Sequence, residues 1–121
     1  MTDYQSLVER YFTCWNTTEP GARRAAVDAL FTPDCVFVDP MAALTGPAEI
    51  DAMIAAVQAQ FPGFVISQLG TTDGHHDQAR FGWEGALPGQ AAVVAGSDVI
   101  AIGPDGRINQ VFGFLDLVPS L

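Results

Sequence analysis

An alternating apolar stretch that ends in a tight turn, AAVVAGSDVIAIGPDG (residues 91–106), decides the fold of this chain. Apolar residues recur at every second position over residues 91–102, which is typical of a β-strand with one buried face. The turn GPDG then reverses the chain, and a second alternating segment follows over residues 107–117. Two such segments joined by a short turn are expected to pair antiparallel in one sheet.

The same alternation extends towards the N-terminus over residues 64–71 and 75–86. Turns are expected between these segments at TTDG and LPGQ, because Gly, Pro and Asp dominate turns. The second half of the chain is therefore predicted to be a four-strand antiparallel meander.

The first half of the chain has a helical period instead. Apolar residues recur there at three- and four-residue spacing, which predicts three helices over residues 3–16, from residue 20 to near Pro33, and over residues 47–61. A short strand is expected at residues 35–39. Helices that precede a meander predict an α+β fold, with the helices across the concave face of a curved sheet and a conical space for a small ligand between them.

Composition narrows the classes of partner. The chain has 121 residues, expected to form one domain over residues 1–121, with 49% hydrophobic and 16% charged residues. Its net charge of −9, with no lysine, argues against nucleic acid and against anionic membranes as partners. No apolar run is long enough to cross a bilayer, and no signal-peptide pattern is visible, so a cytoplasmic location is expected.

Three residues with ionisable side chains occupy positions where an apolar environment is expected. Asp98 shares the parity of the apolar residues in its strand, Asp39 closes the first strand immediately before Pro40, and Tyr11 lies in the middle of the apolar face of the first helix. Each also has a purely structural explanation: an outward-facing Asp98, a turn in which the Asp39 side chain accepts backbone hydrogen bonds, and a packed core tyrosine. They are more informative together, because all three could point into one cavity.

Several motifs resemble those of a known superfamily. RYFTCW, LFTPDCVFVDP, TGPAEI and GSDVIAIGPDGRI are similar to the NTF2-like superfamily of cone-shaped α+β folds, and within it to the SnoaL-like and ketosteroid-isomerase-like branch. The resemblance covers nearly the whole chain. It implies three N-terminal helices packed on a curved, mainly antiparallel sheet that encloses a pocket.

The resemblance also implies roles for the three residues. In ketosteroid isomerases, a tyrosine on the first helix and a protonated aspartate on a late strand form an oxyanion hole, and an aspartate just before a proline transfers the proton. Tyr11, Asp98 and Asp39 match these places. An apolar cavity keeps one carboxyl neutral as a hydrogen-bond donor while another stays ionised as the base.

Three functional hypotheses follow from the resemblance. The first is a cofactor-independent proton-transfer isomerase or polyketide-cyclase-like enzyme that acts on an apolar carbonyl compound. The second is a non-catalytic small-molecule-binding or accessory protein of the same fold, and the third is a protein-binding adaptor. A hydrolase of the limonene-epoxide type is disfavoured, because its arginine two residues before the strand aspartate is replaced by Gly96.

We expect a set of apolar and aromatic residues to line the pocket beside the two carboxylates. Neither a metal nor a cofactor is expected, because His75 and His76 are adjacent on a predicted strand and point to opposite faces. The expected lining residues are Trp15, Phe37, Val57, Phe61, Phe81 and Trp83.

The outer face of the meander is the expected partner surface. By the resemblance, Arg80 and Glu84 face outwards, and relatives commonly dimerise through that surface. A homodimer is therefore expected; a solvated Arg80–Glu84 ion pair is the alternative explanation for these two residues.

Overall fold

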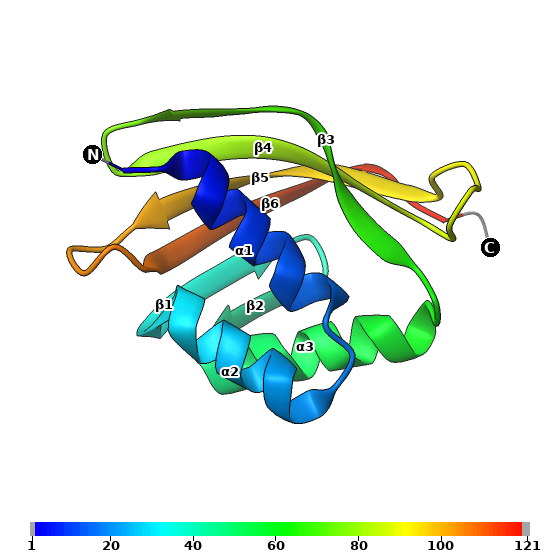
Figure 1. The fold of residues 1–121 in the computed structure, drawn as a ribbon, viewed down its shortest axis with the longest axis horizontal. Coiled ribbons are helices and arrows are strands. Elements are labelled where there is room, and N and C mark those ends of the chain that lie inside the picture. The colour runs from blue at the N-terminus through cyan, green and yellow to red at the C-terminus, as the bar shows by residue number, and fades with distance from the viewer. Residues whose placement is uncertain (1, 120–121) are drawn as a thin grey trace.

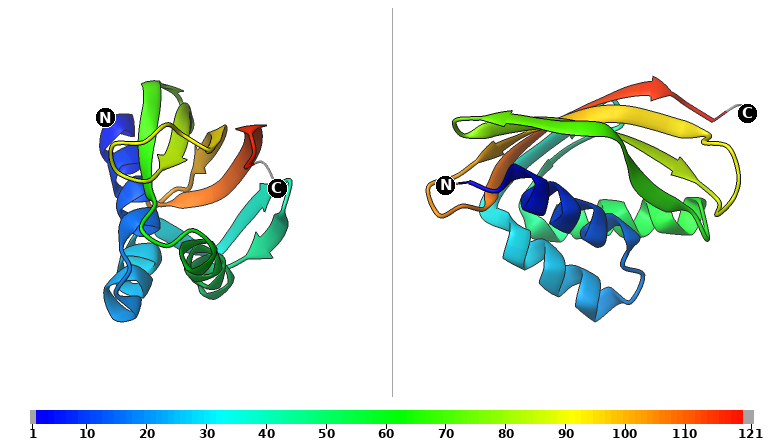
Figure 2. Two further views of the ribbon diagram at one scale, coloured as in Figure 1. Left: turned by 90° about the vertical axis from the view of Figure 1, so that its right-hand side faces the viewer. Right: turned by 45° about the horizontal axis from the view of Figure 1, so that its top comes forward.

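The computed structural model describes residues 2–119 as three helices and one six-stranded sheet (Figure 1). The helices lie on one face of the sheet, which curves around them (Figure 2). The α+β class and the three N-terminal helices are therefore confirmed. In chain order the elements are α1 (Tyr4–Asn16), α2 (Pro20–Leu30), β1 (Phe31–Asp39), β2 (Ala42–Thr45), α3 (Pro47–Gln60), β3 (Val65–His75), β4 (Gln78–Ala86), β5 (Val94–Ile102) and β6 (Ile108–Leu117).

The sheet has the strand order β2-β1-β6-β5-β4-β3. The meander from β3 to β6 is antiparallel as predicted, and only β1 and β6 pair in parallel among the described strands. The sheet twist brings α1 against β3, while α3 packs on β1 and β2 at the other end, and α2 contacts both other helices. The concave face of the central strands β5 and β6 is thereby enclosed from both sides.

Local signals in the sequence account for where the helices begin. The Asp3 carboxylate accepts a hydrogen bond from the Ser6 backbone N–H at the start of α1, at 3.0 Å. The Glu19 carboxylate does the same for α2, with Pro20 in the first turn, where its missing N–H costs nothing. Pro47 begins α3 in the same way, after Gly46 at a φ of 88°.

Two features of the first half differ from the sequence prediction. β1 begins at Phe31, where a continuation of the second helix was expected, because Phe31 pairs with Ile108 of β6. A register shift between Phe31 and Val36 accommodates Pro33, which has no N–H to donate. The short strand β2 was not predicted at all; its four residues are stabilised by antiparallel pairing with the end of β1 rather than by a pattern of their own.

The predicted turn at TTDG is also wrong. β3 continues through these residues to His75, and the chain reverses at residues 76–77 instead. The turn-like residues lie instead in a bulge between Leu69 and Asp73, where the register of β3 against β4 shifts. The ring of Tyr4 packs directly on Gly74, where a Cβ atom would lie 2.5 Å from the ring, and the Tyr4 hydroxyl donates to the His76 carbonyl at 2.8 Å. A contact with α1, remote in sequence, thus stabilises the longer hairpin.

A cluster of aromatic rings forms the centre of the core. The ring of Tyr11 on α1 lies 5.1 Å from that of Phe81 on β4 and 6.2 Å from that of Phe31. Phe12 contacts the same Phe81 ring at 5.5 Å. These edge-to-face contacts fix the middle of α1 against the concave face of the sheet. No helix within residues 2–119 is long and apolar enough to cross a membrane.

A buried polar network joins the three helices. Arg23, only 6% exposed, donates to Asp51 on α3 at 2.9 Å and to the Gln58 side-chain oxygen at 3.0 Å. Gln58 in turn donates to the backbone carbonyls of Trp15 and Thr17, both at 2.9 Å. The guanidinium is thereby paired and hydrogen-bonded, as a buried charge requires, and the end of α1 is tied to α3.

The outer face of the sheet exposes apolar side chains, which bears on the expected homodimer. Phe114 on β6 is 60% exposed, with Phe112 and Val38 beside it on the same face. Arg80 does face outwards, but its partner is Asp73 at 3.4 Å rather than Glu84. A face of this kind favours association with another apolar surface.

We predict that the protein has twice the chain mass in light scattering at micromolar concentration. Phe114→Arg should give the monomer mass without loss of thermal stability, because it places a charge on an exposed face and removes no core contact. Leu87→Arg, which also replaces an exposed apolar residue but lies in the loop between β4 and β5, serves as the control and should remain dimeric. A wild-type protein of monomer mass would contradict the prediction.

Candidate functional site

Asp98 is a buried carboxyl at the centre of the concave face. It lies in the middle of β5, opposite Phe81 of β4 and Gly113 of β6, and it is 5% exposed. The alternation of its strand places it on the same face as Ile100 and Ile102, both buried. The outward-facing alternative for Asp98 is therefore excluded.

Two side chains from different elements donate hydrogen bonds to Asp98. The Tyr11 hydroxyl of α1 donates to Asp98 Oδ2 at 2.6 Å, and the Trp83 indole Nε1–H of β4 donates to Oδ1 at 3.3 Å. The first distance is typical of a strong hydrogen bond to a carboxylate, and the second is long. The structure thus brings together Tyr11 and Asp98, as predicted, and adds Trp83 as a second polar neighbour.

The surroundings of Asp98 favour its protonated form. Burial raises the pKa of the carboxyl from its ordinary value of 3.8 to about 6; the hydrogen bonds from Tyr11 and Trp83 oppose this rise, and the charge of Asp39 adds to it. Burial, and then the charge of Asp98, also raise the pKa of Tyr11 well above 10.0. The phenol is therefore a stable donor, and the carboxyl changes its charge near neutral pH.

Asp39 ends β1 and has a more polar environment. Its Oδ1 accepts hydrogen bonds from the backbone N–H groups of Met41 and Ala42, both at 2.8 Å. This is the turn expected as the structural explanation for Asp39. Among residues 2–119, its second oxygen, Oδ2, accepts no hydrogen bond from the protein. One oxygen of Asp39 thus orients the carboxylate, and the other can accept a proton.

Gly113 lies between the two carboxyl groups. A Cβ atom at this position would be 3.0 Å from Asp39 Cβ and 3.0 Å from Asp98 Oδ1, so these two atoms are separated by no more than twice that distance. The bare backbone of β6 therefore allows the two acidic side chains to approach each other over one strand. Gly113 was not predicted as a site residue, because its place between the two carboxyl groups depends on the parallel pairing of β1 with β6, which a local pattern cannot show.

Gly96 makes room for Trp83. A Cβ atom on Gly96 would lie 2.9 Å from Trp83 Cζ2 and 3.1 Å from Cε2, and it would also overlap the Phe114 carbonyl oxygen. The indole ring therefore lies across the β5 backbone, with its N–H directed at Asp98.

The predicted lining residues divide into two groups. Trp15, Phe37, Phe81 and Trp83 belong to the core cluster or pack against it, with the two tryptophans partly exposed. Val57 and Phe61 are half-buried at and just after the C-terminal end of α3 and do not belong to this cluster; the Phe61 ring lies 5.3 Å from that of Phe64. Partly buried residues that the analysis did not assign to the site also pack against the core: Leu44, Met53 and Ile66.

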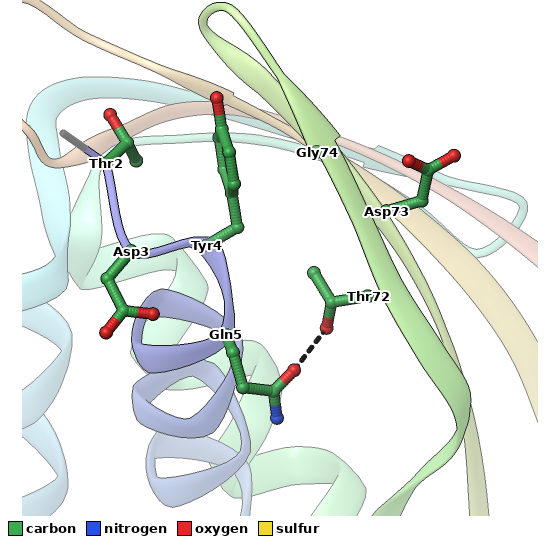
Figure 3. A pocket seen from close by; sticks show the side chains of 7 residues that line it. All are labelled: Thr2, Asp3, Tyr4, Gln5, Thr72, Asp73 and Gly74. Carbon is green, nitrogen blue, oxygen red and sulfur yellow. Dashed lines mark hydrogen bonds between the residues drawn. The ribbon is translucent and has the colours of Figure 1, made fainter.

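Two hollows lie on the surface away from Asp98. The larger, of about 630 Å³, lies between the start of α1 and β3, where Gln5 and Thr72 approach each other (Figure 3). The Thr72 hydroxyl donates to Gln5 Oε1 at 2.6 Å, and Gln68 completes a ring of hydrogen bonds with both residues. The second, of about 380 Å³, is on the outer face beside Arg80. Neither hollow includes Tyr11 or Asp98.

The histidines and cysteines do not join the site. His75 and His76 are exposed at the β3–β4 reversal with their rings 6.0 Å apart, and residues 2–119 contain no group of three or more His, Cys, Asp or Glu side chains that could hold a metal ion. Cys14 and Cys35 are buried free thiols, and burial raises the pKa of Cys14 to about 11 and that of Cys35 to about 12. Both thiols are therefore unreactive packing residues.

Comparison with known proteins identifies the family. A family model described as the SnoaL-like domain matches residues 8–111. The chain belongs to the SnoaL-like family. A proposed isomerase of that family from Agrobacterium tumefaciens is 35% identical, with a TM-score of 0.90 over 96% of this chain and 99% of the other. No curated protein matches the chain at a significant level.

More distant structures show that this SnoaL-like domain has the NTF2-like fold. A proposed polyketide cyclase from Sinorhizobium meliloti is 24% identical, with a TM-score of 0.68 over 89% of this chain and 93% of that protein. An NTF2-like protein from Cytophaga hutchinsonii is 13% identical, with a TM-score of 0.67 over 96% of this chain and 92% of the other. The expected resemblance to the SnoaL-like branch is thus confirmed for the fold and the family.

The buried carboxyl of this SnoaL-like domain predicts a pH dependence of stability. A carboxyl whose pKa is higher in the folded than in the unfolded state stabilises the fold most below the unfolded value of 3.8, and this stability is lost as the pH rises through about 6. The loss attributable to Asp98 should be about 3 kcal/mol. Urea unfolding across this range should show that Asp98→Asn removes this component, whereas Asp34→Asn, at an exposed position on β1, should not. Parallel curves for Asp98→Asn and wild type would contradict the prediction.

A second prediction concerns Gly96. Gly96→Ala should destabilise the domain by about 2–3 kcal/mol, because the added methyl group overlaps a backbone carbonyl and the Trp83 ring. Its Trp83 fluorescence spectrum should shift as the ring leaves its position. Gly103→Ala is the control, since a Cβ atom there makes only contacts of 3.4 Å and longer; equal destabilisation of the two variants would refute the explanation.

Proposed function

We propose that this SnoaL-like domain is a cofactor-independent enzyme that transfers a proton within an apolar carbonyl compound, as an isomerase or a polyketide-cyclase-like enzyme. The observation that carries the proposal is the buried Asp98 carboxyl with its two hydrogen-bond donors, next to the ionisable Asp39. Pairs of carboxyl groups in unlike environments are the arrangement by which one acts as acid and the other as base at the same pH.

Asp39 is the base in this proposal. Its free Oδ2 removes a proton from the carbon next to the carbonyl; the electron pair of that C–H bond forms the enolate double bond, and the carbonyl π pair moves onto oxygen. For isomerisation, Asp39 then returns the proton to another carbon. For cyclisation, the enolate carbon attacks a second carbonyl, whose π pair moves onto its oxygen, and Asp39 returns the proton to that alkoxide. The two backbone hydrogen bonds to Oδ1 orient the carboxylate for both steps.

Asp98 stabilises the negative oxygen that develops in this step. A carboxyl with a pKa of about 6 is mostly neutral below that pH and remains roughly one-tenth protonated at pH 7, and in the neutral form it can donate a hydrogen bond to an enolate oxygen. The aromatic residues around it exclude water, which strengthens that hydrogen bond. The apolar surroundings also favour an apolar substrate over a charged one.

The activities proposed for two similar proteins agree with this class of reaction. The relative from Agrobacterium tumefaciens is a proposed isomerase, and the protein from Sinorhizobium meliloti is a proposed polyketide cyclase. Both classes include reactions that begin by removing a proton next to a carbonyl, and this common step supports the proposal.

A non-catalytic small-molecule-binding protein is the second candidate. The observation that favours it is the turn at Asp39, in which one carboxylate oxygen is already occupied by the backbone of Met41 and Ala42. In that case Asp39 is a structural residue, and Asp98 alone determines the ligand. The third hypothesis, a protein-binding adaptor, gains no support from the site.

The two candidates predict different results for a simple ketone. β-Tetralone loses the hydrogens next to its carbonyl to deuterated water once it is enolised, and NMR measures the rate of this exchange. Asp39→Asn should slow the protein-catalysed exchange by at least about a hundredfold, because the base is removed. The same variant should bind β-naphthol, which mimics the enol of β-tetralone, within about threefold of wild type, because the donor side of the site is unchanged.

Removal of Asp98 should have the complementary effect. Asp98→Ala should weaken β-naphthol binding by about a hundredfold or more, since the loss of one oxyanion donor costs about 3 kcal/mol in other enzymes. Asp34→Asn on the same strand as Asp39 is the matched control for charge and should change neither value. Binding without catalysed exchange in the wild type would establish the non-catalytic candidate. The absence of both would refute a small-molecule role at this site.

A further inference from the structure

The hydroxyl proton of Tyr11 is already engaged. A phenol has one donor proton, and that of Tyr11 is directed at Asp98 Oδ2 at 2.6 Å. The side chain is only 2% exposed, and the ring is held between Phe12 and Phe81. Turning this proton towards a ligand would leave a buried carboxyl oxygen without its donor, which is costly. Tyr11 is therefore placed to support Asp98 rather than to contact a ligand.

The N–H group of Trp83 is in the opposite situation. Its hydrogen bond to Asp98 Oδ1 is long at 3.3 Å, and the side chain is partly exposed. Gly96 allows the ring to lie across β5, so the N–H edge is held beside the carboxyl. An indole nitrogen is a donor only, and a weakly bonded donor at a partly exposed position can change its acceptor at little cost.

The same oxygen of Asp98 lies on the side of Gly113 and Asp39. Oδ1 lies 3.0 Å from the place where a Gly113 side chain would begin, with Asp39 on the other side of it. When Asp98 is neutral, we expect its proton to be bound to Oδ1. Oδ2 accepts the shorter hydrogen bond from Tyr11, and this bond would be weakened if Oδ2 carried the proton. The Oδ1–H group then lies next to the Trp83 N–H group, which is directed at the same oxygen.

We propose that Trp83, and not Tyr11, is the second hydrogen-bond donor to the ligand oxygen, beside Asp98. Tyr11 is a positioning residue that holds Asp98 with Oδ1 towards the ligand. The proposal rests on the proposed function, since it assigns the donors around the same enolate oxygen. Each donor proton then has one acceptor. Tyr11 donates to Asp98 Oδ2, and both the Oδ1–H group and the Trp83 N–H group donate to the ligand oxygen.

The experiment compares the affinity of β-naphthol for two single variants. Binding is measured by calorimetry about one unit below the pKa of Asp98, where the carboxyl is neutral, so that a change in its ionisation does not contribute. Trp83→Phe should lose about tenfold to a hundredfold in affinity, because a hydrogen bond to the ligand oxygen is removed. Tyr11→Phe should lose clearly less. Any other order, including equal losses, overturns the proposal.

Two further measurements are made. The first distinguishes a role of the Trp83 N–H group from a role of its ring. The second distinguishes failure of this inference from failure of the proposed function. Replacement of Trp83 by benzothienylalanine, which keeps the bicyclic ring but has sulfur in place of N–H, should lose as much affinity as Trp83→Phe; retained affinity overturns the donor role. Asp98→Ala is measured in the same series. If it loses affinity and Trp83→Phe does not, the inference fails alone, whereas no loss in either variant refutes the proposed function itself.

Tyr11 should reveal its positioning role through pH. The ionisable groups that face Asp98 are Tyr11 from α1 and Asp39 from β1. Tyr11→Phe removes a hydrogen bond that lowers the pKa of Asp98, so the pH at which Asp98-linked stability is lost should rise. Tyr4→Phe removes a hydroxyl that donates to the His76 carbonyl at the other end of the same α1–sheet contact, and it should leave this pH unchanged. A Tyr11→Phe profile that coincides with wild type would overturn the positioning role.

Discussion

A carboxyl group buried in the middle of a β-sheet is the constraint on which the site depends. An ionised carboxylate without partners is among the most costly groups to bury, and two hydrogen bonds from neutral donors offset only part of that cost. The part of the burial cost that these hydrogen bonds do not offset raises the pKa of Asp98. Its donors come from α1 and from β4, so the polar centre forms only when the helix and the sheet are packed together.

The two carboxyl groups differ because their surroundings differ. Asp98 is buried and accepts hydrogen bonds from Tyr11 and Trp83, whereas Asp39 is half-buried and is held at a turn by two backbone N–H groups. They belong to strands that are far apart in sequence and are both neighbours of β6. Gly113 on that strand has no side chain to separate them. One sheet thus holds two acidic groups close together in unlike surroundings, one buried and one at a turn.

The sequence predicted the elements better than their connections. Helical and alternating periods identified three helices and the four-strand meander, because these patterns are local. The turn-like TTDG was assigned wrongly, since its conformation depends on Tyr4, which packs on Gly74 from the opposite end of the chain. The strand β2 was missed because four residues are too few to show a period, and its pairing with β1 is what stabilises it.

The site was predictable to the same extent. Asp98 was identifiable because an acidic residue interrupts an apolar alternation, and Asp39 and Tyr11 were identifiable by resemblance to a family. The hydrogen bond from Trp83 could not be foreseen, because it requires the space above Gly96 and the register of β4 against β5. Contacts set by register across strands are the part of a site that a single sequence does not specify.

The short hydrogen bond between Tyr11 and Asp98 also requires α1 to be placed with an accuracy that apolar packing alone does not provide. Hydrophobic contacts are not directional, and a shift of one residue along the helix would rotate Tyr11 by about 100° away from the sheet. Directional contacts fix both ends of α1. Tyr4 is bonded to the β3–β4 reversal, and the Asn16 amide exchanges two hydrogen bonds of 2.8 Å with the Ile66 backbone. Since Gln58 also holds the last turn of the helix, the middle of α1 can remain apolar around its single hydroxyl and still present that hydroxyl at 2.6 Å from the carboxyl.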